Sequence, residues 1–147
     1  MKQIKSAACA VVVRADDTVD LVPCDTDKTL SLDKLHQLVN GYIEVIYASR
    51  FAPLVMILNE EGRLLNLPVN KAATAWQNDV YGNEINEPIV GDVVIMRADG
   101  DNLIGLNPKL AKQLGAAFSQ RLQNKTISDF LKEHVECELT KVKRHAR

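Results

Sequence analysis

The sequence predicts an α+β fold in which a largely antiparallel sheet is combined with short helices and with two C-terminal helices packed on one face. Three observations lead to this class. Short β-branched segments alternate with turn residues over 8–102. The connections between them are mainly of hairpin type, which favours antiparallel pairing. Two amphipathic helical patterns then follow in the C-terminal part.

The first two predicted strands form a hairpin. Residues 8–13 are an apolar, β-branched run that ends at Asp16 and Asp17, and alternation resumes over 18–22. Pro23 ends the second strand because proline has no N–H to donate to a ladder. The N-terminus superficially resembles a signal peptide, but its apolar run is short and passes directly into charged residues. We therefore expect a buried strand there.

A helix with clear start and stop signals comes next. Ser31 is a typical N-cap, and Leu30 and Leu35 stand at the positions of a hydrophobic staple. Apolar residues recur on one stripe as far as Asn40 and Gly41, which can adopt a left-handed turn and stop the helix. These signals predict a helix of about two turns.

Three strand-like segments follow at 42–48, 54–58 and 64–69. The polar residues 59–62, which include Gly62, predict a tight hairpin between the last two of them. Pro68 indicates that the strand over 64–69 lies at an edge or finishes there. Asn70 is then expected to cap a short helix over 71–76, before a polar loop over 77–88.

The remaining elements lead into the C-terminal helices. Residues 89–96 are predicted as a buried strand and 99–102 as a turn. Asn107 and Pro108 mark the start of an amphipathic helix, since proline in the first helical turn loses no hydrogen bond. A second helix opens at Thr126 or Ser128, and 137–142 fits a helix extension or an edge strand equally well.

Composition limits the classes of protein that the chain can belong to. Its 147 residues predict one domain, 1–147, with a sheet-rich core (1–102) and a helical C-terminal extension (103–147). The net charge of −1 gives no basic face for nucleic acid, and we interpret the basic residues in 141–147 as a solvated tail. Three widely spaced cysteines predict reduced thiols and a cytoplasmic protein. No stretch is long enough to cross a membrane.

The usual catalytic and metal-binding motifs do not occur in the sequence. The histidines are scattered, and only His134 with Cys137 has ligand-like spacing, which is half of a metal site at best. There is no G-x-S-x-G elbow and no glycine-rich phosphate loop. We therefore predict no catalytic residues, no metal and no cofactor.

The segment 59–70 is the most informative one for function. Hairpin formation explains its polar start and capping explains its end, but neither explains Asn66 inside an apolar run, where an amide needs partners. One interpretation is an edge-strand side chain that faces water. The other is a recognition group in a ligand-binding groove. The residues predicted for that groove are Tyr42, Glu44, Arg63, Asn66, Asn70 and Trp76.

Three blocks of sequence, QLVNGYIEVIYA, NEEGRLLNLPVNKAAT and IVGDVVI, occur in the order and spacing of a known family. Over about Leu30 to Arg97 the chain resembles an uncharacterised family of domains of unknown function that is found in bacteria, phages and mobile elements. The resemblance carries over no catalytic residue. It implies a mobile-element origin, where small proteins often bind host factors or immune signalling nucleotides.

Three functions follow as hypotheses. The first is a non-enzymatic binding protein in a counter-defence role, acting in the host cytoplasm, which sequesters a nucleotide-like small molecule or binds a host protein. The second is a small hydrolase that uses Glu44, Glu60, Glu61 or Asp92 as acid and base. The third is an assembly subunit that forms a homo-oligomer through apolar helices over 108–135.

Overall fold

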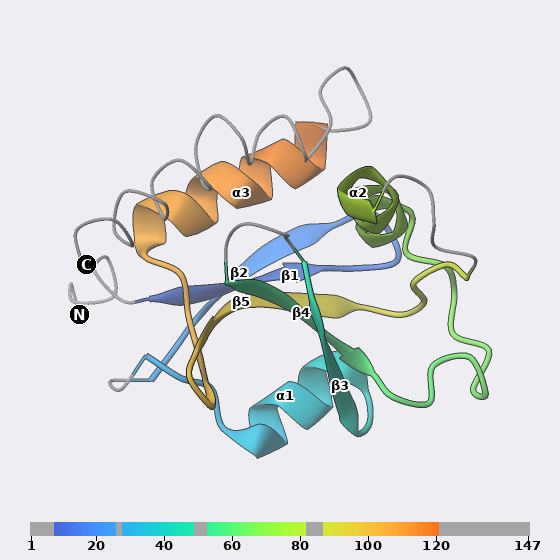
Figure 1. The fold of residues 1–147 in the computed structure, drawn as a ribbon, viewed down its shortest axis with the longest axis horizontal. Coiled ribbons are helices and arrows are strands. Elements are labelled where there is room, and N and C mark those ends of the chain that lie inside the picture. Colours follow the sequence, from blue (N-terminus) through green and yellow to red (C-terminus); the bar gives the residue numbers. More distant parts are fainter. Residues whose placement is uncertain (1–7, 26–27, 49–52, 82–86, 121–147) are drawn as a thin grey trace.

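The computed structural model describes residues 8–25, 28–48, 53–81 and 87–120, and these form an antiparallel sheet with helices on both of its faces (Figure 1). The sheet has six strands in the order β2-β1-β5-β4-β3, and the short β6 pairs with β5. The strands are β1 (Cys9–Val13), β2 (Val19–Pro23), β3 (Ile43–Tyr47), β4 (Leu54–Asn59), β5 (Val93–Asp99) and β6 (Asn102–Ile104). The helices are α1 (Leu32–Val39), α2 (Lys71–Tyr81) and α3 (Pro108–Gln120).

The central strands are buried on both faces. All five residues of β1 and all six of β4 are buried. Alternate side chains of β1 enter two separate apolar clusters: Val11 belongs to the cluster under α2 and α3, whereas Val12 belongs to the cluster under α1. Continuous apolar runs are typical of strands covered on both sides.

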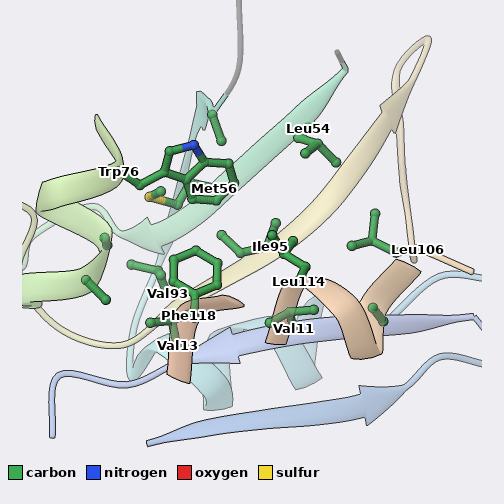
Figure 2. Close-up of a cluster of buried hydrophobic side chains, with 14 of the residues drawn as sticks. Val11, Val13, Leu54, Met56, Trp76, Val93, Ile95, Leu106, Leu114 and Phe118 are labelled. Atoms are coloured by element: carbon green, nitrogen blue, oxygen red, sulfur yellow. The ribbon is translucent and has the colours of Figure 1, made fainter. Parts of the chain in front are cut away.

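The helices do not share one face of the sheet, which corrects the predicted packing. Helix α1 contacts β3, β4 and β5 through Leu35 and Val39. Helix α3 lies across β1 and β2 on the opposite side, where Leu114 and Phe118 join Trp76 of α2 in the larger cluster (Figure 2). The prediction failed because hairpin connections and amphipathic stripes do not indicate to which side of a sheet a helix crosses.

Several local predictions are confirmed. The β1–β2 hairpin forms, with Val11 opposite Leu21. Ser31 caps α1 by accepting a hydrogen bond from the Lys34 N–H, and Asn40 ends the helix in a left-handed conformation with φ of 64°. Asn107 caps α3 through the Leu110 N–H at 2.8 Å.

Other predicted boundaries moved or lie outside the described residues. Helix α2 continues to Tyr81, well beyond residue 76. The last long strand, β5, begins at Val93 rather than at residue 89. The predicted elements at 126–135 and 137–142 lie outside the described residues. Among the described helices, none combines the length and the apolarity that crossing a membrane would require.

Candidate functional site

The predicted hairpin at residues 59–69 is absent, and a single helical turn takes its place. The Leu65 N–H donates to the Glu61 carbonyl at 3.0 Å, and the Leu67 N–H donates to the Gly62 carbonyl at 3.0 Å. Asn66 has φ of 56°, and its N–H donates to the Arg63 carbonyl. These are the bonds of a Schellman motif, in which the residue after the turn adopts the left-handed conformation. Asparagine tolerates that conformation better than most residues do. The prediction that Asn66 lies in an edge strand was therefore wrong, although its side chain is exposed to water as that interpretation expected.

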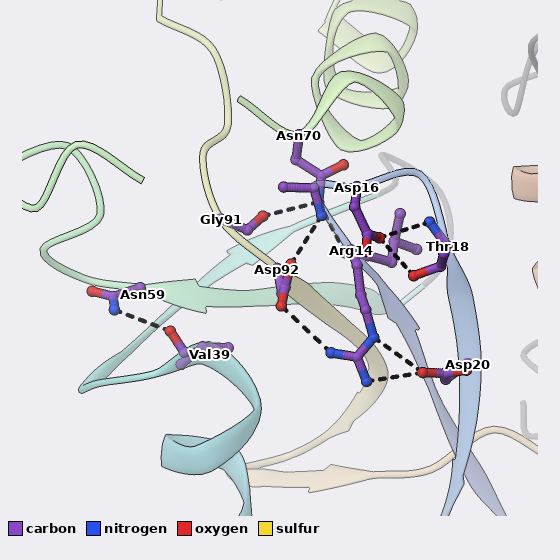
Figure 3. A network of polar contacts seen from close by, with 11 residues as sticks. Arg14, Asp16, Thr18, Asp20, Val39, Asn59, Asn70, Gly91 and Asp92 are labelled. Carbon is purple, nitrogen blue, oxygen red and sulfur yellow. Dashed lines mark hydrogen bonds and ion pairs between the residues drawn. The ribbon is translucent and has the colours of Figure 1, made fainter. Parts of the chain in front are cut away.

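Asn59 holds this turn against the end of α1. Its side-chain NH₂ group donates to the carbonyls of Val39 and Asn40 at 3.0 and 3.1 Å, as Figure 3 shows for Val39. Its side-chain oxygen accepts a hydrogen bond from the Glu61 N–H at 2.7 Å. The buried amide therefore satisfies helix-end carbonyls that would otherwise be orphaned. From the sequence, Asn59 was predicted only to be part of a turn.

A small hollow lies between this turn, β3, the end of β4 and the segment that leads into β5. It has a volume of about 70 Å³. Gly62 forms part of its wall, and a Cβ atom at that position would come within 2.8 Å of Val90 Cγ2, so no larger residue fits without a shift. The residues that line the hollow are Glu44, Leu58, Asn59, Glu60, Glu61, Gly62, Arg63, Leu64, Ile89 and Val90.

The charged groups of the hollow are mainly acidic. Glu44, Glu60 and Glu61 are all exposed. The Arg63 guanidinium is already engaged, because it lies 3.1 Å from a Glu87 carboxylate oxygen and donates to the Pro88 carbonyl at 3.3 Å. An ion pair this exposed contributes on the order of 0–1 kcal/mol to stability. The hollow is therefore a small acidic depression, and the one arginine among its lining residues already has partners.

Leu64, which lines the hollow, and two residues that flank its lining residues along the chain have exposed side chains. Leu64 is 82% exposed and Leu65 is 54% exposed, although both belong to a turn with several internal hydrogen bonds. Tyr42 is 66% exposed, and its carbonyl accepts a hydrogen bond from the Glu60 N–H at 2.9 Å. We call the hollow together with Tyr42, Leu64, Leu65 and Asn66 the Arg63 surface. The exposure of the two leucines was not predicted, because the segment that contains them was expected to be a strand.

The six predicted site residues separate into two groups. Glu44 and Arg63 line the same hollow. Tyr42 and Asn66 are exposed but do not line it, and the Tyr42 ring packs edge-on against His36, with ring centroids 5.5 Å apart. Trp76 and Asn70 are each 0% exposed, so neither side chain reaches a groove on the surface. Trp76 packs edge-on against Phe118, with ring centroids 5.2 Å apart. Trp76 and Asn70 were predicted to share one groove with the other four residues because residues 64–69 were expected to form an extended strand.

Asn70 instead joins three parts of the scaffold (Figure 3). Its side-chain NH₂ group donates to the carbonyls of Val13 and Gly91 at 2.8 and 2.9 Å. Its side-chain oxygen accepts the Ala73 N–H at 3.1 Å, which caps α2 as predicted. Both donors and the acceptor of the buried amide are thus satisfied within the protein.

A second polar network ties the β1–β2 turn to the start of β5. Arg14 donates to Asp20 at 2.9 Å and to Asp92 at 3.4 Å, and Asp92 also accepts the Ala15 N–H at 2.9 Å. The hydrogen bond with Asp20 raises the pKa of Arg14 above its ordinary value. The role of Asp92 in the structure is to position this turn, and it lies outside the residues that line the hollow.

Two further titratable groups have shifted pKa values. Hydrogen bonds from the Thr18 hydroxyl and backbone N–H lower the pKa of Asp16. Desolvation raises the pKa of the Cys9 thiol. Within the residues that the structure describes, no group of three or more histidine, cysteine, aspartate or glutamate side chains could hold a metal ion. The His134 and Cys137 pair lies outside the described residues.

Comparison with known proteins identifies the family. The model of a domain of unknown function, DUF3846, matches residues 8–119. The chain belongs to the DUF3846 family. The match extends the resemblance seen over 30–97 to include β1, β2 and α3 of this DUF3846 domain. Neither a curated protein nor a solved structure gives a significant match to the chain.

Proposed function

We propose that this DUF3846 domain is a non-enzymatic binding protein that engages a host protein through the Arg63 surface, in the counter-defence role that a mobile-element origin implies. The observation that carries the proposal is the pair of adjacent leucines, Leu64 and Leu65, held exposed by a hydrogen-bonded turn. Exposed apolar side chains grouped on one surface are typical of interaction sites. A turn that is already ordered loses little conformational entropy when it binds.

The charges of the surface define the chemistry of the partner. Glu44, Glu60 and Glu61 lie beside the leucines. Among the residues that line the hollow, Arg63 carries the only positive charge, and it already forms an ion pair with Glu87. A partner segment that carries apolar side chains flanked by lysine or arginine is complementary to this arrangement. We therefore expect binding to weaken as salt concentration rises.

The same features disfavour a nucleotide ligand, which was the other form of the binding hypothesis. Ligand pockets usually enclose roughly 300–1,000 Å³, and the hollow has about 70 Å³. A nucleotide would also bring its phosphates toward three carboxylates. A protein partner avoids both difficulties, because it needs contact area rather than an enclosed volume.

The proposal is tested by affinity capture from bacterial lysate with quantitative mass spectrometry. Leu64→Asp and Leu65→Asp should each lose the partners that the unmodified chain retains. Leu32→Asp is the matched control, because Leu32 is similarly exposed at 57% but lies on α1, where aspartate in the first turn is compatible with the helix. Equal capture by all three variants would refute the proposal. ADP-ribose and cyclic dinucleotides should leave the thermal unfolding midpoint unchanged.

A hydrolase remains the second candidate, because Glu44, Glu60 and Glu61 line one hollow. Two carboxylates near one substrate can divide the roles of acid and base. Turnover of a phosphoester or peptide substrate that is abolished by Glu44→Gln, with folding preserved, would favour this candidate over the binding protein.

A further inference from the structure

The end of α1 carries a dipeptide with a reactivity of its own. Asn40 is followed by Gly41, and no other asparagine in the sequence is followed by glycine. In such a pair the backbone nitrogen of the glycine can attack the side-chain carbonyl carbon of the asparagine, because glycine has no Cβ to hinder the approach. Asn40 is exposed, so water reaches its side chain. This is therefore the asparagine of the chain at which deamidation without an enzyme meets the least local steric resistance.

Deamidation at this position needs water and no other reagent. The Gly41 nitrogen loses its proton to solvent and bonds to Asn40 Cγ, while the Cγ–Nδ2 bond breaks and ammonia leaves with a proton taken from water. Water then opens the cyclic imide at either of its carbonyls. Opening at Cγ gives aspartate. Opening at the main-chain carbonyl gives isoaspartate, in which the backbone runs through Cγ and is longer by one methylene.

The fold holds the two reacting groups apart. Asn40 has φ of 64° and ψ of 37°, which places the Gly41 nitrogen and the Asn40 side chain on opposite sides of the Cα–C bond. The Gly41 N–H also donates to the His36 carbonyl at 3.0 Å. Ring closure requires rotation about the Cα–C bond and breaks this hydrogen bond. The reaction therefore proceeds from an opened cap, a local opening of the kind that native proteins undergo.

Asn59 opposes that opening. Its side-chain NH₂ group donates to the Asn40 carbonyl at 3.1 Å and to the Val39 carbonyl at 3.0 Å. The first of these carbonyls belongs to the peptide unit that must rotate. Asn59 is 3% exposed, and a buried hydrogen bond is costly to lose. Asn59 is thus a guard of the dipeptide as well as an anchor of the turn over residues 59–67.

Isoaspartate at position 40 does not fit against Asn59. A Cβ atom on Gly41 would already lie 2.7 Å from Asn59 Nδ2, so the backbone is in close contact with the buried amide. A main chain that is longer by one methylene at this point displaces the amide. The Asn59 side-chain oxygen then loses the Glu61 N–H, which it accepts at 2.7 Å, and the turn loses its anchor.

We propose that Asn40 is a deamidation site guarded by Asn59, and that isoaspartate at this position releases the turn that carries Leu64 and Leu65. A released turn no longer presents the leucines in one ordered arrangement, so binding through the Arg63 surface has to supply the ordering entropy. Because deamidation is irreversible, the surface weakens with the age of the molecule. The effect on binding rests on the proposed function, whereas the chemistry at Asn40 does not.

Incubation of the full chain in mildly alkaline buffer, followed by peptide mass spectrometry, tests the site without any variant. In urea, modification should accumulate first at Asn40. Folding should slow it by about the factor by which folding slows hydrogen exchange of the Gly41 N–H, because both reactions need the same opening. An equal rate of deamidation at Asn40 in the folded and unfolded chains would overturn the proposal.

Two buried asparagines give a matched pair of variants for the guard. Asn59→Ala should raise the rate at Asn40 about 5- to 30-fold, which is the change in population expected from the loss of a buried hydrogen bond or two. Asn70→Ala removes a buried amide with three hydrogen bonds from another part of the fold and should leave the rate unchanged. Circular dichroism checks that both variants fold. Equal rates in the two variants would overturn the guard role of Asn59, because global unfolding would then expose the site.

The isoaspartyl chain, purified by ion exchange, tests the release of the turn. Its Leu65 and Leu67 amide protons should exchange faster than in the unmodified chain, because their hydrogen bonds to the carbonyls of Glu61 and Gly62 open. Asn40→Asp carries the same charge on a backbone of ordinary length and should keep slow exchange at both amides. Unchanged exchange in the isoaspartyl chain would overturn the proposal.

Affinity capture then separates this inference from the proposed function. Partners that Leu64→Asp loses should also be depleted from the isoaspartyl chain. If the isoaspartyl chain retains them, the proposed function stands and the regulation is refuted. If Leu64→Asp retains every partner, the proposed function is refuted, and hydrogen exchange still decides whether isoaspartate releases the turn.

Discussion

The buried amide of Asn70 offers the sharpest test of the scaffold, because replacing it should cost much more than removing a helix cap. Asn70→Ala removes the cap of α2, which costs about 1 kcal/mol. It also removes the side-chain donor from the buried carbonyls of Val13 and Gly91, and each lost buried hydrogen bond costs about 1–2 kcal/mol. The expected loss is about 3–5 kcal/mol, a large part of the 5–15 kcal/mol that a domain typically has.

Urea unfolding followed by circular dichroism measures this loss. With a typical urea m-value of about 2 kcal/mol/M, the midpoint should fall by roughly 2 M. Asn107→Ala is the matched control, because Asn107 is also an N-cap but is exposed and, within the part of the chain that the structure describes, donates to no buried carbonyl. The difference between the two variants isolates the two carbonyls. If Asn70→Ala were no more harmful than Asn107→Ala, the scaffold role of Asn70 would be refuted.

Three further predictions concern the backbone and pH. Asn66→Val should lower the free energy of unfolding by about 1–2 kcal/mol, and Asn66→Gly should not, because only the β-branched residue opposes the left-handed conformation. Equal effects of the two variants in urea titrations would contradict this prediction. Gly115→Ala in α3 should raise the free energy of unfolding by about 0.5–1 kcal/mol, because glycine weakens a helix interior and the added Cβ would meet Leu21 Cδ2 at an ordinary 3.4 Å. A fall in the thermal unfolding midpoint would mean that the helix has no room for the methyl group. The hydrogen bonds from Thr18 lower the pKa of Asp16 in the folded state, so their contribution is fully present above the ordinary carboxyl pKa of 3.8 and is lost as pH falls through the folded value. Stability profiles of Asp16→Asn and the unmodified chain should therefore converge below that pH, and a gap that persisted there would exclude this linkage.

Local signals in the sequence predicted much of the secondary structure. Ser31 and Asn107 begin their helices, and Asn40 ends one in the left-handed conformation. The β-branched run of β1 and the turn residues after it were sufficient to predict the first hairpin. In these cases the determining interactions lie within a few residues of each other, so that spacing alone carries the information.

The candidate site was harder to predict because long-range contacts determine it. The turn over residues 59–67 depends on Asn59, whose amide bonds to the end of α1 about 20 positions earlier in the chain. That contact redirects the chain, so Leu64 and Leu65 become exposed instead of alternating between a buried and a solvated face. Trp76 lies beneath α3 for a similar reason, since its neighbour Phe118 is distant in sequence.

Because helices cover both faces of the sheet, this fold divides the molecule into an interior that resists change and a perimeter that tolerates it. A substitution in β1 or β4 must satisfy two packed layers at once, whereas one at Leu64 or Val45 disturbs neither. The perimeter is therefore the part of the described chain in which side chains can change with the least cost to the architecture.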